Sequence, residues 1–395
     1  MRRWWALPLA IFVASRVVES LVLSQLLGMQ HDWFIPAGGG PYHSWGHPVT
    51  LVEGLSNWDG AWYRQIAQHG YPHHLPRIDG VVQQNAWAFY PMFPALARAV
   101  MLLGLSFETS AVIVSLVCAA VASCLLFRLV AEHASRFTAS MAVIGLMFAP
   151  MAPIFEAAYT ESLALLLLVL ALTALGHRRY GWFSIFTLLV AFARPMSLPL
   201  ALVCGVQWLL RWRRREQEPF EMRERIKLGA AAIWAALSFG LWPAVAALRT
   251  GEADAYFKTQ NAWAGSSAAN GWPSWLQQAL HLQSIMAVSV VVGVLGGAIA
   301  LVVQRGARAW GPELRTWTWA YPLYILGTAR PTSSIFRYLL LTITPFWPVP
   351  SVSERVRSVP ARVGLVALVA GIGIALQYLW LSAYFVIWPH LKGAP

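Results

Sequence analysis

Length, composition and charge exclude most soluble classes for this chain. It has 395 residues, of which 58% are hydrophobic and only 12% are charged, whereas about a quarter of the residues of a soluble protein carry charge. The mean hydropathy is +0.54, and apolar runs long enough to cross a bilayer recur from end to end. The chain has a net charge of +12. Its Lys and Arg residues fall between the apolar runs rather than along one polar face, which argues against nucleic-acid binding. We therefore predict an all-α, multi-pass integral membrane protein with a single membrane domain, residues 1–395.

The apolar runs predict about eleven crossings. The first run follows the basic start MRRWW and lacks a small-residue cleavage site, so we expect it to be a retained helix. Within it, Arg16 and Glu19 are spaced for an i, i+3 ion pair. Prolines and an arginine in RPMSLP predict two short helices over residues 182–211 in place of one. The expected spans are residues 7–27, 110–130, 138–154, 160–176, 182–194, 196–211, 228–248, 284–304, 315–328, 337–350 and 362–386.

Positive charge marks one side of this map. With the N-terminus in the cytoplasm, every loop on that side is basic, as the positive-inside rule requires. Counting YPMFPALARAVMLLGL (about 90–105) as a crossing would break the pattern, so we expect it to lie in or dip into the outer leaflet. Two longer segments, 28–109 and 249–283, then face outward. The basic residues of the cytoplasmic loops are Arg2, Arg3, Arg128, Arg136, Arg178, Arg179, RWRRR with Arg223, Arg225 and Lys227, Arg305, Arg308, Arg315, Arg355, Arg357 and Arg362.

The first outer segment contains SNWDGAWYRQIAQHGYP, which predicts a short helix that starts at Asp59 and stops at Gly70. Trp62 and Ile66 share one face of it, so we expect the helix to rest on the membrane surface. Asp59 fits two compatible interpretations, a helix N-cap or a reactive carboxylate. NAWAFYPMFPAL follows, and its aromatic residues fit either a groove for a lipid chain or an interfacial anchor.

The next outward loop, PIFEAAYTES, brings further carboxylates toward the same face. We expect Glu156, Tyr159 and Glu161 to lie near Asp59. Thr160 followed by Glu161 is also typical of an ordinary helix start, because the helix dipole favours an acidic residue there.

Two arginines, Arg194 in ARPMSLP and Arg337 in SSIFRYLL, are expected at the outer ends of spans, against the positive-inside trend. A guanidinium can grip a phosphate with two hydrogen bonds. The alternative for each is a bond to helix-end carbonyls or to lipid headgroups. Arg64 and Lys258 are weaker phosphate-binding candidates of the same kind.

No pattern predicts a cofactor. The sequence contains no Walker motif, no Rossmann glycine pattern and no cytoplasmic Asp-x-Asp pair that would hold a metal–nucleotide diphosphate. A divalent metal is an open alternative, because histidines crowd the first outer segment, but their order matches no metal signature. The cysteines lie inside apolar runs without metal-ligand spacing. These residues are His43, His47, His69, His73, His74, Cys118, Cys124 and Cys204.

Four blocks in order, WDGAWYRQIAQHGY, NAWAFYPMFPAL, FEAAYTESLALL and ARPMSLPL, resemble the PIG-V family, the mannosyltransferases that add the second mannose to GPI anchors and that have bacterial relatives. The blocks run from about residue 55 to 200; beyond them the resemblance covers only hydropathy and the RYLL segment. The chain departs in having RPMS where the family often has an Arg-Ser-Asn type sequence, and in the Gly-rich stretch Gly38–Gly40. The acceptor and the sugar therefore stay unassigned.

The resemblance implies a GT-C fold, with a catalytic carboxylate in the first outer loop and a polyprenyl-phosphate sugar as donor. Asp59 is the acid of the WD pair, preceded by Trp58, and Tyr159 and Glu161 occupy the YTES block. We therefore expect an inverting mannosyltransferase at the outer face of the membrane, the cell membrane if the source is bacterial. Its partners would be membrane lipids, the donor and a glycolipid or glycan acceptor.

The catalytic prediction names Asp59 as the base and Glu161 as a residue that orients the acceptor or supports Asp59. The predicted substrate-binding residues are Trp58, Arg64, Tyr159, Arg194 and Arg337. Transfer of another sugar is an alternative within the same class. A lipid transporter or flippase is the alternative from a different class and predicts charged residues near the bilayer midplane. A non-catalytic membrane scaffold would need no clustered carboxylates.

Overall fold

The structure is a computed structural model that describes residues 3–30, 47–264, 273–275, 296, 311–330, 332, 334–343 and 353–387. Its helices of ten or more residues are α1 (Ala6–Leu27), α3 (Asp59–His69), α4 (Met92–Met101), α5 (Phe107–Ala131), α6 (Arg136–Met147), α7 (Glu161–Gly176), α8 (Tyr180–Ala193), α9 (Ser197–Arg213), α10 (Met222–Ser238), α11 (Leu241–Thr250), α12 (Ala255–Ala264), α15 (Gly311–Thr328) and α18 (Val359–Trp380).

Shorter elements join these helices: α2 (Leu51–Gly54), η1 (Ala86–Ala88), η2 (Ala152–Phe155), α16 (Ser334–Leu339), η5 (Leu340–Thr342) and the π-helical turn η7 (Leu381–Phe385). One antiparallel hairpin is present, in which β1 (Arg77–Ile78) pairs with β2 (Val81–Val82). The prediction of an all-α chain is therefore correct for the described residues except at this hairpin.

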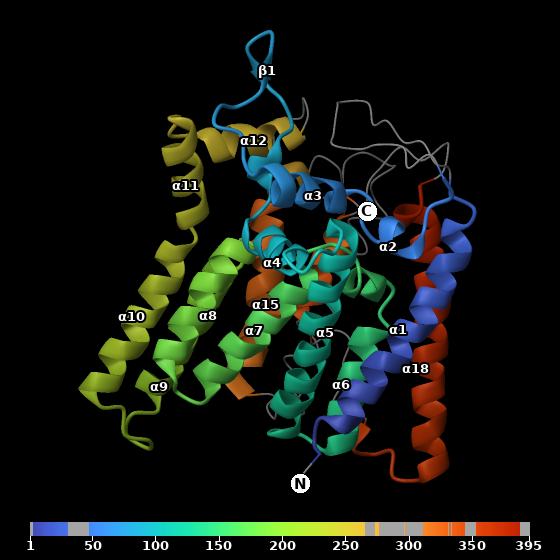
Figure 1. Cartoon of the computed structure of the whole chain (residues 1–395). Coiled ribbons are helices and arrows are strands. Elements are labelled where there is room, and N and C mark those ends of the chain that lie inside the picture. The colour runs from blue at the N-terminus through green and yellow to red at the C-terminus, as the bar shows by residue number, and fades with distance from the viewer. Residues whose placement is uncertain are drawn as a thin grey trace.

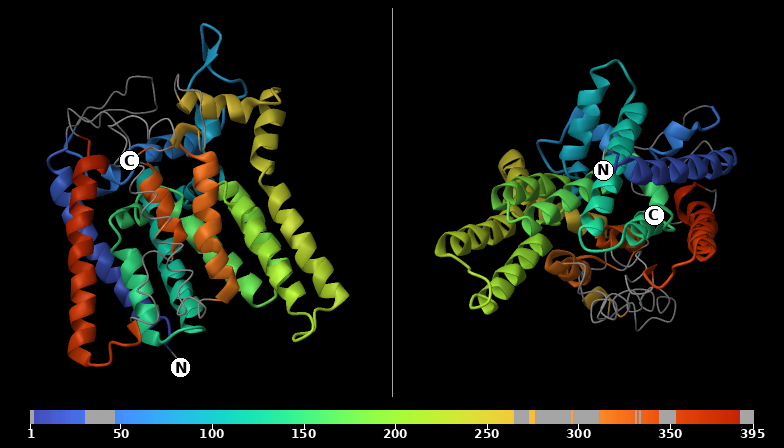
Figure 2. Two further views of the ribbon diagram at one scale, coloured as in Figure 1. Left: turned by 180° about the vertical axis from the view of Figure 1, so that it is seen from behind. Right: turned by 90° about the horizontal axis from the view of Figure 1, so that it is seen from below.

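The long helices run between two ends of the molecule (Figure 1). α1 begins at the lower end, beside the N-terminus, and reaches the upper end near α2. α3 and α12 lie across the upper end (Figure 1). Seen from below, α9 and α10 lie on one side of the bundle and α18 on the other (Figure 2). The basic turns between α5 and α6 and between α9 and α10 lie at the lower end, opposite α3.

Four helices are long and apolar enough to cross a membrane by length and composition: Ala6–Leu27, Phe107–Ala131, Met222–Thr250 and Val359–Phe385. α4, α6, α7 and α8 are apolar but shorter. These helices are typical of an integral membrane protein, although the predicted count of about eleven crossings is not confirmed. The predicted span 284–304 lies outside the described residues. The span 337–350 is described only to residue 343, where it forms α16 and η5.

The predicted span 138–154 is wrong at its C-terminal end, because α6 stops at Met147. Pro150 and Pro153 follow, and proline cannot continue a helix. The last carbonyls of such a helix need donors. Arg16 of α1 donates to the Met147 carbonyl at 3.1 Å, and Gln377 of α18 donates to the Ala149 carbonyl at 3.1 Å. The helix end is thereby satisfied inside the bundle.

The predicted interruption of residues 182–211 is confirmed, and its cause is local. α8 ends at Ala193, and Arg194 is extended, with φ −159° and ψ 157°. Pro195 disfavours the helical conformation for the residue before it, which accounts for this geometry. Within the segment 90–105, the helical part is the ten-residue α4. At 1.5 Å per residue this helix is about 15 Å long, too short to cross the bilayer.

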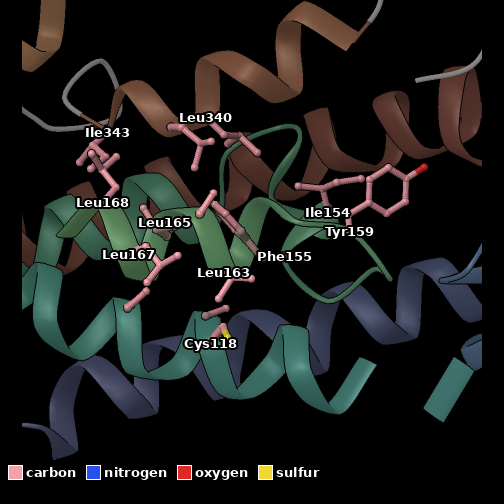
Figure 3. Close-up of a cluster of buried hydrophobic side chains, with 14 of the residues drawn as sticks. Cys118, Ile154, Phe155, Tyr159, Leu163, Leu165, Leu167, Leu168, Leu340 and Ile343 are labelled. Atoms are coloured by element: carbon pink, nitrogen blue, oxygen red, sulfur yellow. The ribbon is translucent and has the colours of Figure 1, made fainter. Parts of the chain in front are cut away.

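α7 occupies the centre of the bundle and is apolar on all sides, as a fully surrounded helix must be. It packs against α5 and α8. Figure 3 shows its leucines between Cys118 of α5 on one side and Leu340 and Ile343 on the other. Leu165, Leu168 and Ile343 are fully buried. This core fixes the position of the first residue of α7, Glu161.

Candidate active site

Asp59 is the first residue of α3. The interpretation of Asp59 as the N-cap is wrong, because Trp58 occupies that position and makes no side-chain capping bond. A carboxylate in the first turn is nonetheless favoured by the helix dipole. Gly70 ends the helix as predicted, with φ +77°. The Asp59 side chain is 22% exposed, so a reactant can reach it.

Glu161 is the first residue of α7, and its side chain is completely buried. Arg194 meets it from the break between α8 and α9, with 2.6 Å between Arg194 Nη1 and Glu161 Oε1. The same guanidinium donates to the Thr160 hydroxyl at 3.2 Å. The extended backbone that Pro195 imposes thus places Arg194 against the N-terminus of α7.

Arg337 of α16 joins the two carboxylates. Its Nη1 lies 2.6 Å from Asp59 Oδ2, and its Nε lies 3.5 Å from Glu161 Oε1. The four charged side chains therefore form one row in the order Asp59, Arg337, Glu161, Arg194. They come from α3, α16, α7 and the α8–α9 break, and the sequence separates Asp59 from Arg337 by more than two hundred residues. We name this row the Asp59 cluster.

The Asp59 cluster holds two negative and two positive formal charges, which offset one another. This balance permits burial, because a buried charge without a partner is strongly destabilising. Burial decreases toward Asp59: the Glu161 side chain is 1% exposed, Arg337 6% and Asp59 22%. Asp59 is therefore the carboxylate open to a reactant, while Glu161 holds the guanidiniums in place.

Aromatic faces line the two guanidiniums. The Arg194 carbon Cζ lies 4.9 Å from the Tyr338 ring centre, and Arg337 Cζ lies 5.3 Å from the same ring. Arg337 Cζ also lies 4.9 Å from the Tyr159 ring centre. Such contacts stabilise a cation where water is excluded. Tyr338 was not predicted as a site residue. The only sequence signal for this segment was its neighbour Arg337.

Tyr159 supports the backbone before Asp59. Its hydroxyl donates to the Asn57 carbonyl at 3.2 Å and accepts from the Asp59 amide at 3.3 Å. Burial, with the nearby charge of Asp59, raises the pKa of the Tyr159 phenol well above its usual range, so the hydroxyl keeps its proton. The Tyr159 side chain is completely buried, which gives it a supporting position beneath the site.

Trp58, predicted to bind substrate, is also buried, at 4% exposure. Its backbone has φ +57° and ψ −114°, a conformation that costs a bulky residue on the order of 1–3 kcal/mol. The indole Nε1 donates to the Phe385 carbonyl at 2.8 Å. The side chain thus faces the end of α18, and its backbone defines the turn into Asp59.

The aromatic residues around α3 are buried in protein rather than open to lipid. Trp62 is 3% exposed and stacks on Phe89, with 5.6 Å between ring centres. Trp263 of α12 meets the Trp62 ring edge-on at 5.2 Å. The expectation that the Trp62–Ile66 face rests on the membrane is therefore wrong. NAWAFYPMFPAL likewise does not expose an aromatic groove, since Trp87 and Phe93 are buried.

Three predicted charged residues lie outside the Asp59 cluster. Arg64 pairs with Glu108 of α5 at 3.3 Å. Lys258 pairs with Glu252 and Asp254 on the surface at 3.0 and 2.8 Å. Glu156, expected near Asp59, instead accepts from Ser20 of α1 at 3.0 Å, because η2 turns it toward α1.

Glu156 lies beside a second charged group, formed by Arg16, Glu19 and Gln377. The predicted i, i+3 pair is confirmed, with 2.5 Å between Arg16 Nη1 and Glu19 Oε2. Gln377 donates to Glu19 Oε1 at 2.8 Å. Glu19 is completely buried and Arg16 is 6% exposed. We name Arg16, Glu19, Glu156 and Gln377 the Arg16 cluster.

The described residues contain no group of three or more His, Cys, Asp or Glu side chains that could hold a metal ion. His47 pairs with Glu53, at 3.4 Å between His47 Nε2 and Glu53 Oε1. His43 lies outside the described residues. In the described part of the chain, the charged group in contact with Asp59 is the Arg337 guanidinium.

Comparison with known proteins gives weak similarities. No family model matches the sequence, and no curated protein matches it. Solved structures of the oligosaccharyltransferase AglB from Archaeoglobus fulgidus align with the chain. The complex with an inhibitory peptide and a dolichol-phosphate is 12% identical and aligns with a TM-score of 0.49; the alignment covers 97% of this chain and 56% of the AglB chain. The complex with Zn and sulfate is 14% identical, with 98% and 53% coverage and a TM-score of 0.48.

This chain therefore spans about half the length of those structures. The functional assignment rests on its own residues.

Proposed function

We propose that this protein is an inverting membrane glycosyltransferase that moves a mannosyl residue from a polyprenyl phosphate to a hydroxyl group of a glycolipid or glycan. The observation that carries the proposal is the contact between a partly exposed carboxylate, Asp59, and a buried guanidinium, Arg337. It provides a base for a hydroxyl and a cation for a phosphate within one site. The four sequence blocks that resemble the PIG-V family point to the same chemistry.

Asp59 takes the proton from the acceptor hydroxyl, whose oxygen attacks the anomeric carbon of the donor. The bond between that carbon and the phosphate oxygen breaks, and the polyprenyl phosphate leaves with the bonding electrons. Because the phosphate is already a good leaving group, no general acid is needed. One carboxylate therefore suffices, unlike a glycosidase, in which two carboxylates flank the bond.

Arg337 neutralises the charge that grows on the leaving phosphate, and Arg194 supports it from the other side of Glu161. Guanidiniums held by fixed partners need no rearrangement of solvent during the reaction, which makes their stabilisation of charge effective. A bidentate contact with the phosphate would replace the present contact of Arg337 with Asp59. Donor binding then frees the Asp59 carboxylate for the acceptor.

Substrate confinement supports the reaction as well. α3, which begins at Asp59, lies at the upper end of the bundle, and the basic turns lie at the lower end (Figure 1). The positive-inside rule then favours an extracytoplasmic site. Donor and acceptor lipids would both be held at that interface, which raises their effective concentration and fixes their orientation.

The test is transfer of label from polyprenyl-phosphate-[¹⁴C]mannose to a native lipid extract by purified protein. We compare wild type with Asp59→Asn and with Asp254→Asn, which makes the same chemical change at an exposed ion pair with Lys258. Loss of the base should reduce transfer by about 10²- to 10⁴-fold in Asp59→Asn, and Asp254→Asn should match wild type.

Equal transfer by wild type and Asp59→Asn would remove Asp59 as the base. If wild type, folded and monodisperse, transfers no mannose, the same assay with other polyprenyl-phosphate sugars tests the choice of sugar. Failure with every such donor would refute the glycosyltransferase proposal itself.

A further inference from the structure

The turn that presents Asp59 is held by residues outside the turn, at the end of α18 and just after α1. Asn57, Trp58 and Asp59 form this turn, and Trp58 is one of the few described non-glycine residues with positive φ. A side chain as large as Trp adopts this conformation only where its surroundings hold it. The contacts of the turn therefore identify the elements that fix Asp59.

The first of these elements is the end of α18. The helix widens into the π-helical turn η7, in which the Val386 amide donates to the Leu381 carbonyl five residues before it, at 3.0 Å. The final carbonyls of a helix lack partners within the helix. The Phe385 carbonyl is one of these, and the Trp58 indole Nε1 donates to it at 2.8 Å. Each group thus satisfies the other where both are buried.

The second contact comes from Gln30, three residues beyond the end of α1. Gln30 Oε1 accepts from Asn57 Nδ2 at 2.9 Å and from the Ile387 amide at 3.2 Å. One side-chain oxygen therefore joins the turn to Ile387, the second residue after η7. Adjacent residues of the turn are thus linked to the same C-terminal segment, Trp58 by a direct hydrogen bond and Asn57 through Gln30.

Burial along α18 agrees with this role. The buried residues of the helix, Gly373, Gln377 and Trp380, all lie in its last two to three turns. Phe385 and Val386 beyond them are also buried. The Phe385 ring lies 6.4 Å from the ring of Tyr159, the residue that bonds the turn from the opposite side. α18 is therefore attached to the described part of the bundle chiefly at the end that touches the turn.

Resting on the proposed function, we infer that Trp58 is a positioning residue rather than a substrate-binding one: its bond to Phe385 in η7, with the Gln30 bridge, fixes Asp59 for proton transfer. π-Helical turns inside helices are frequent at functional sites. Asp59 and Arg337 belong to elements that are far apart in sequence, so no local backbone geometry fixes the distance between them. The turn that positions Asp59 therefore contributes to this distance. Loosening it should impair the reaction without removing any charged group.

The test uses Trp58→Phe, which removes the indole N–H and keeps an aromatic ring. The matched control is Trp208→Phe, which removes a comparable bond, from Trp208 Nε1 to the Arg225 carbonyl at 3.1 Å. Two readouts are compared in detergent: steady-state transfer kinetics, and hydrogen–deuterium exchange of the peptide covering residues 55–62. The second readout requires no substrate.

For Trp58→Phe we expect faster exchange in residues 55–62 and a kcat lower by about 10- to 100-fold, the effect of a misplaced reacting group. The donor KM should stay within about twofold of wild type, because no phosphate contact is lost. Trp208→Phe should change neither readout. If Trp58→Phe does not fold, Gln30→Ala provides the same test with Trp58 intact, since it removes the acceptor shared by Asn57 and Ile387.

A raised KM at unchanged kcat would overturn the inference and make Trp58 a substrate-binding residue. Unchanged exchange and unchanged kcat in Trp58→Phe would overturn it as well. If wild type shows no transfer with any donor, the proposed function fails, and the exchange comparison still decides whether Trp58 and η7 hold the turn.

Discussion

The Asp59 cluster and the Arg16 cluster are both buried groups of charged side chains, but they bind different partners. Arg16 donates to the carbonyls of Met147 and Ala152 at 3.1 and 3.0 Å, besides pairing with Glu19. Arg337 instead contacts two carboxylates. The Arg16 cluster therefore satisfies backbone groups at a helix end, whereas the contacts of Arg337 are with side chains that a ligand can replace.

Exposure separates the two clusters in the same way. Glu19 and Arg16 are enclosed by α1, the end of α6 and α18. Asp59 keeps 22% of its side chain exposed. Removal of one partner from a buried pair is strongly destabilising, whereas a partly open carboxylate is accessible for chemistry. The transporter alternative predicts charged residues near the bilayer midplane. The buried charges of the Arg16 cluster have a structural explanation instead, because Arg16 donates to backbone carbonyls at and after the end of α6.

The largest effect that distinguishes the clusters should be a loss of stability in Arg16→Met. This change removes the cation paired with the buried Glu19 and the donor to the Ala152 carbonyl, which should lower the free energy of unfolding by about 3–5 kcal/mol. We would measure it by SDS-induced unfolding in mixed micelles. Arg128→Met, at an exposed pair with Glu132, should cost at most about 1 kcal/mol.

Transfer activity per folded molecule should be unchanged in Arg16→Met. If the variant keeps its stability and loses transfer, the Arg16 cluster has a functional role and the contrast between the clusters breaks down.

A smaller effect, on rate, is expected for Arg337→Lys. Lysine keeps the positive charge but cannot make the planar bidentate contact with a phosphate. We expect kcat/KM for the donor to fall by about 10- to 100-fold, measured by initial rates of label transfer. Arg77→Lys, at the exposed pair with Glu252, serves as the control. Wild-type kinetics in Arg337→Lys would remove Arg337 from the phosphate site.

The smallest effect concerns donor binding in Asp59→Asn. Asp59 competes with a phosphate for Arg337, so the neutral amide should let the phosphate bind more tightly, by about 3- to 10-fold, a typical value for loss of one competing charge contact. Binding of sugar-free polyprenyl phosphate can be followed by titration calorimetry in detergent. Weaker or equal binding would show that the contact between Asp59 and Arg337 does not compete with the donor.

The sequence by itself singled out the four charged residues that meet in the Asp59 cluster. Glu161, Arg194 and Arg337 stood out because charge is rare in this chain and each lies at the predicted end of an apolar segment, and Asp59 stood out in the WD block of the first outer segment. Pro195 predicted the helix break that orients Arg194. The i, i+3 spacing of Arg16 and Glu19 predicted their ion pair. Such features are local, so a linear pattern can reveal them.

Only the tertiary structure decided which of these residues meet. Helical spacing could not tell that Glu156 turns toward α1 while Glu161 faces Arg194, since their separation of five residues spans the turn after η2. Nor could it show that Trp62 packs against Trp263 rather than lipid, or that the end of α18 holds Trp58. In an apolar chain, protein and lipid offer similar surroundings to a hydrophobic face. Hydropathy therefore identifies the helices, and packing between distant segments sets their neighbours.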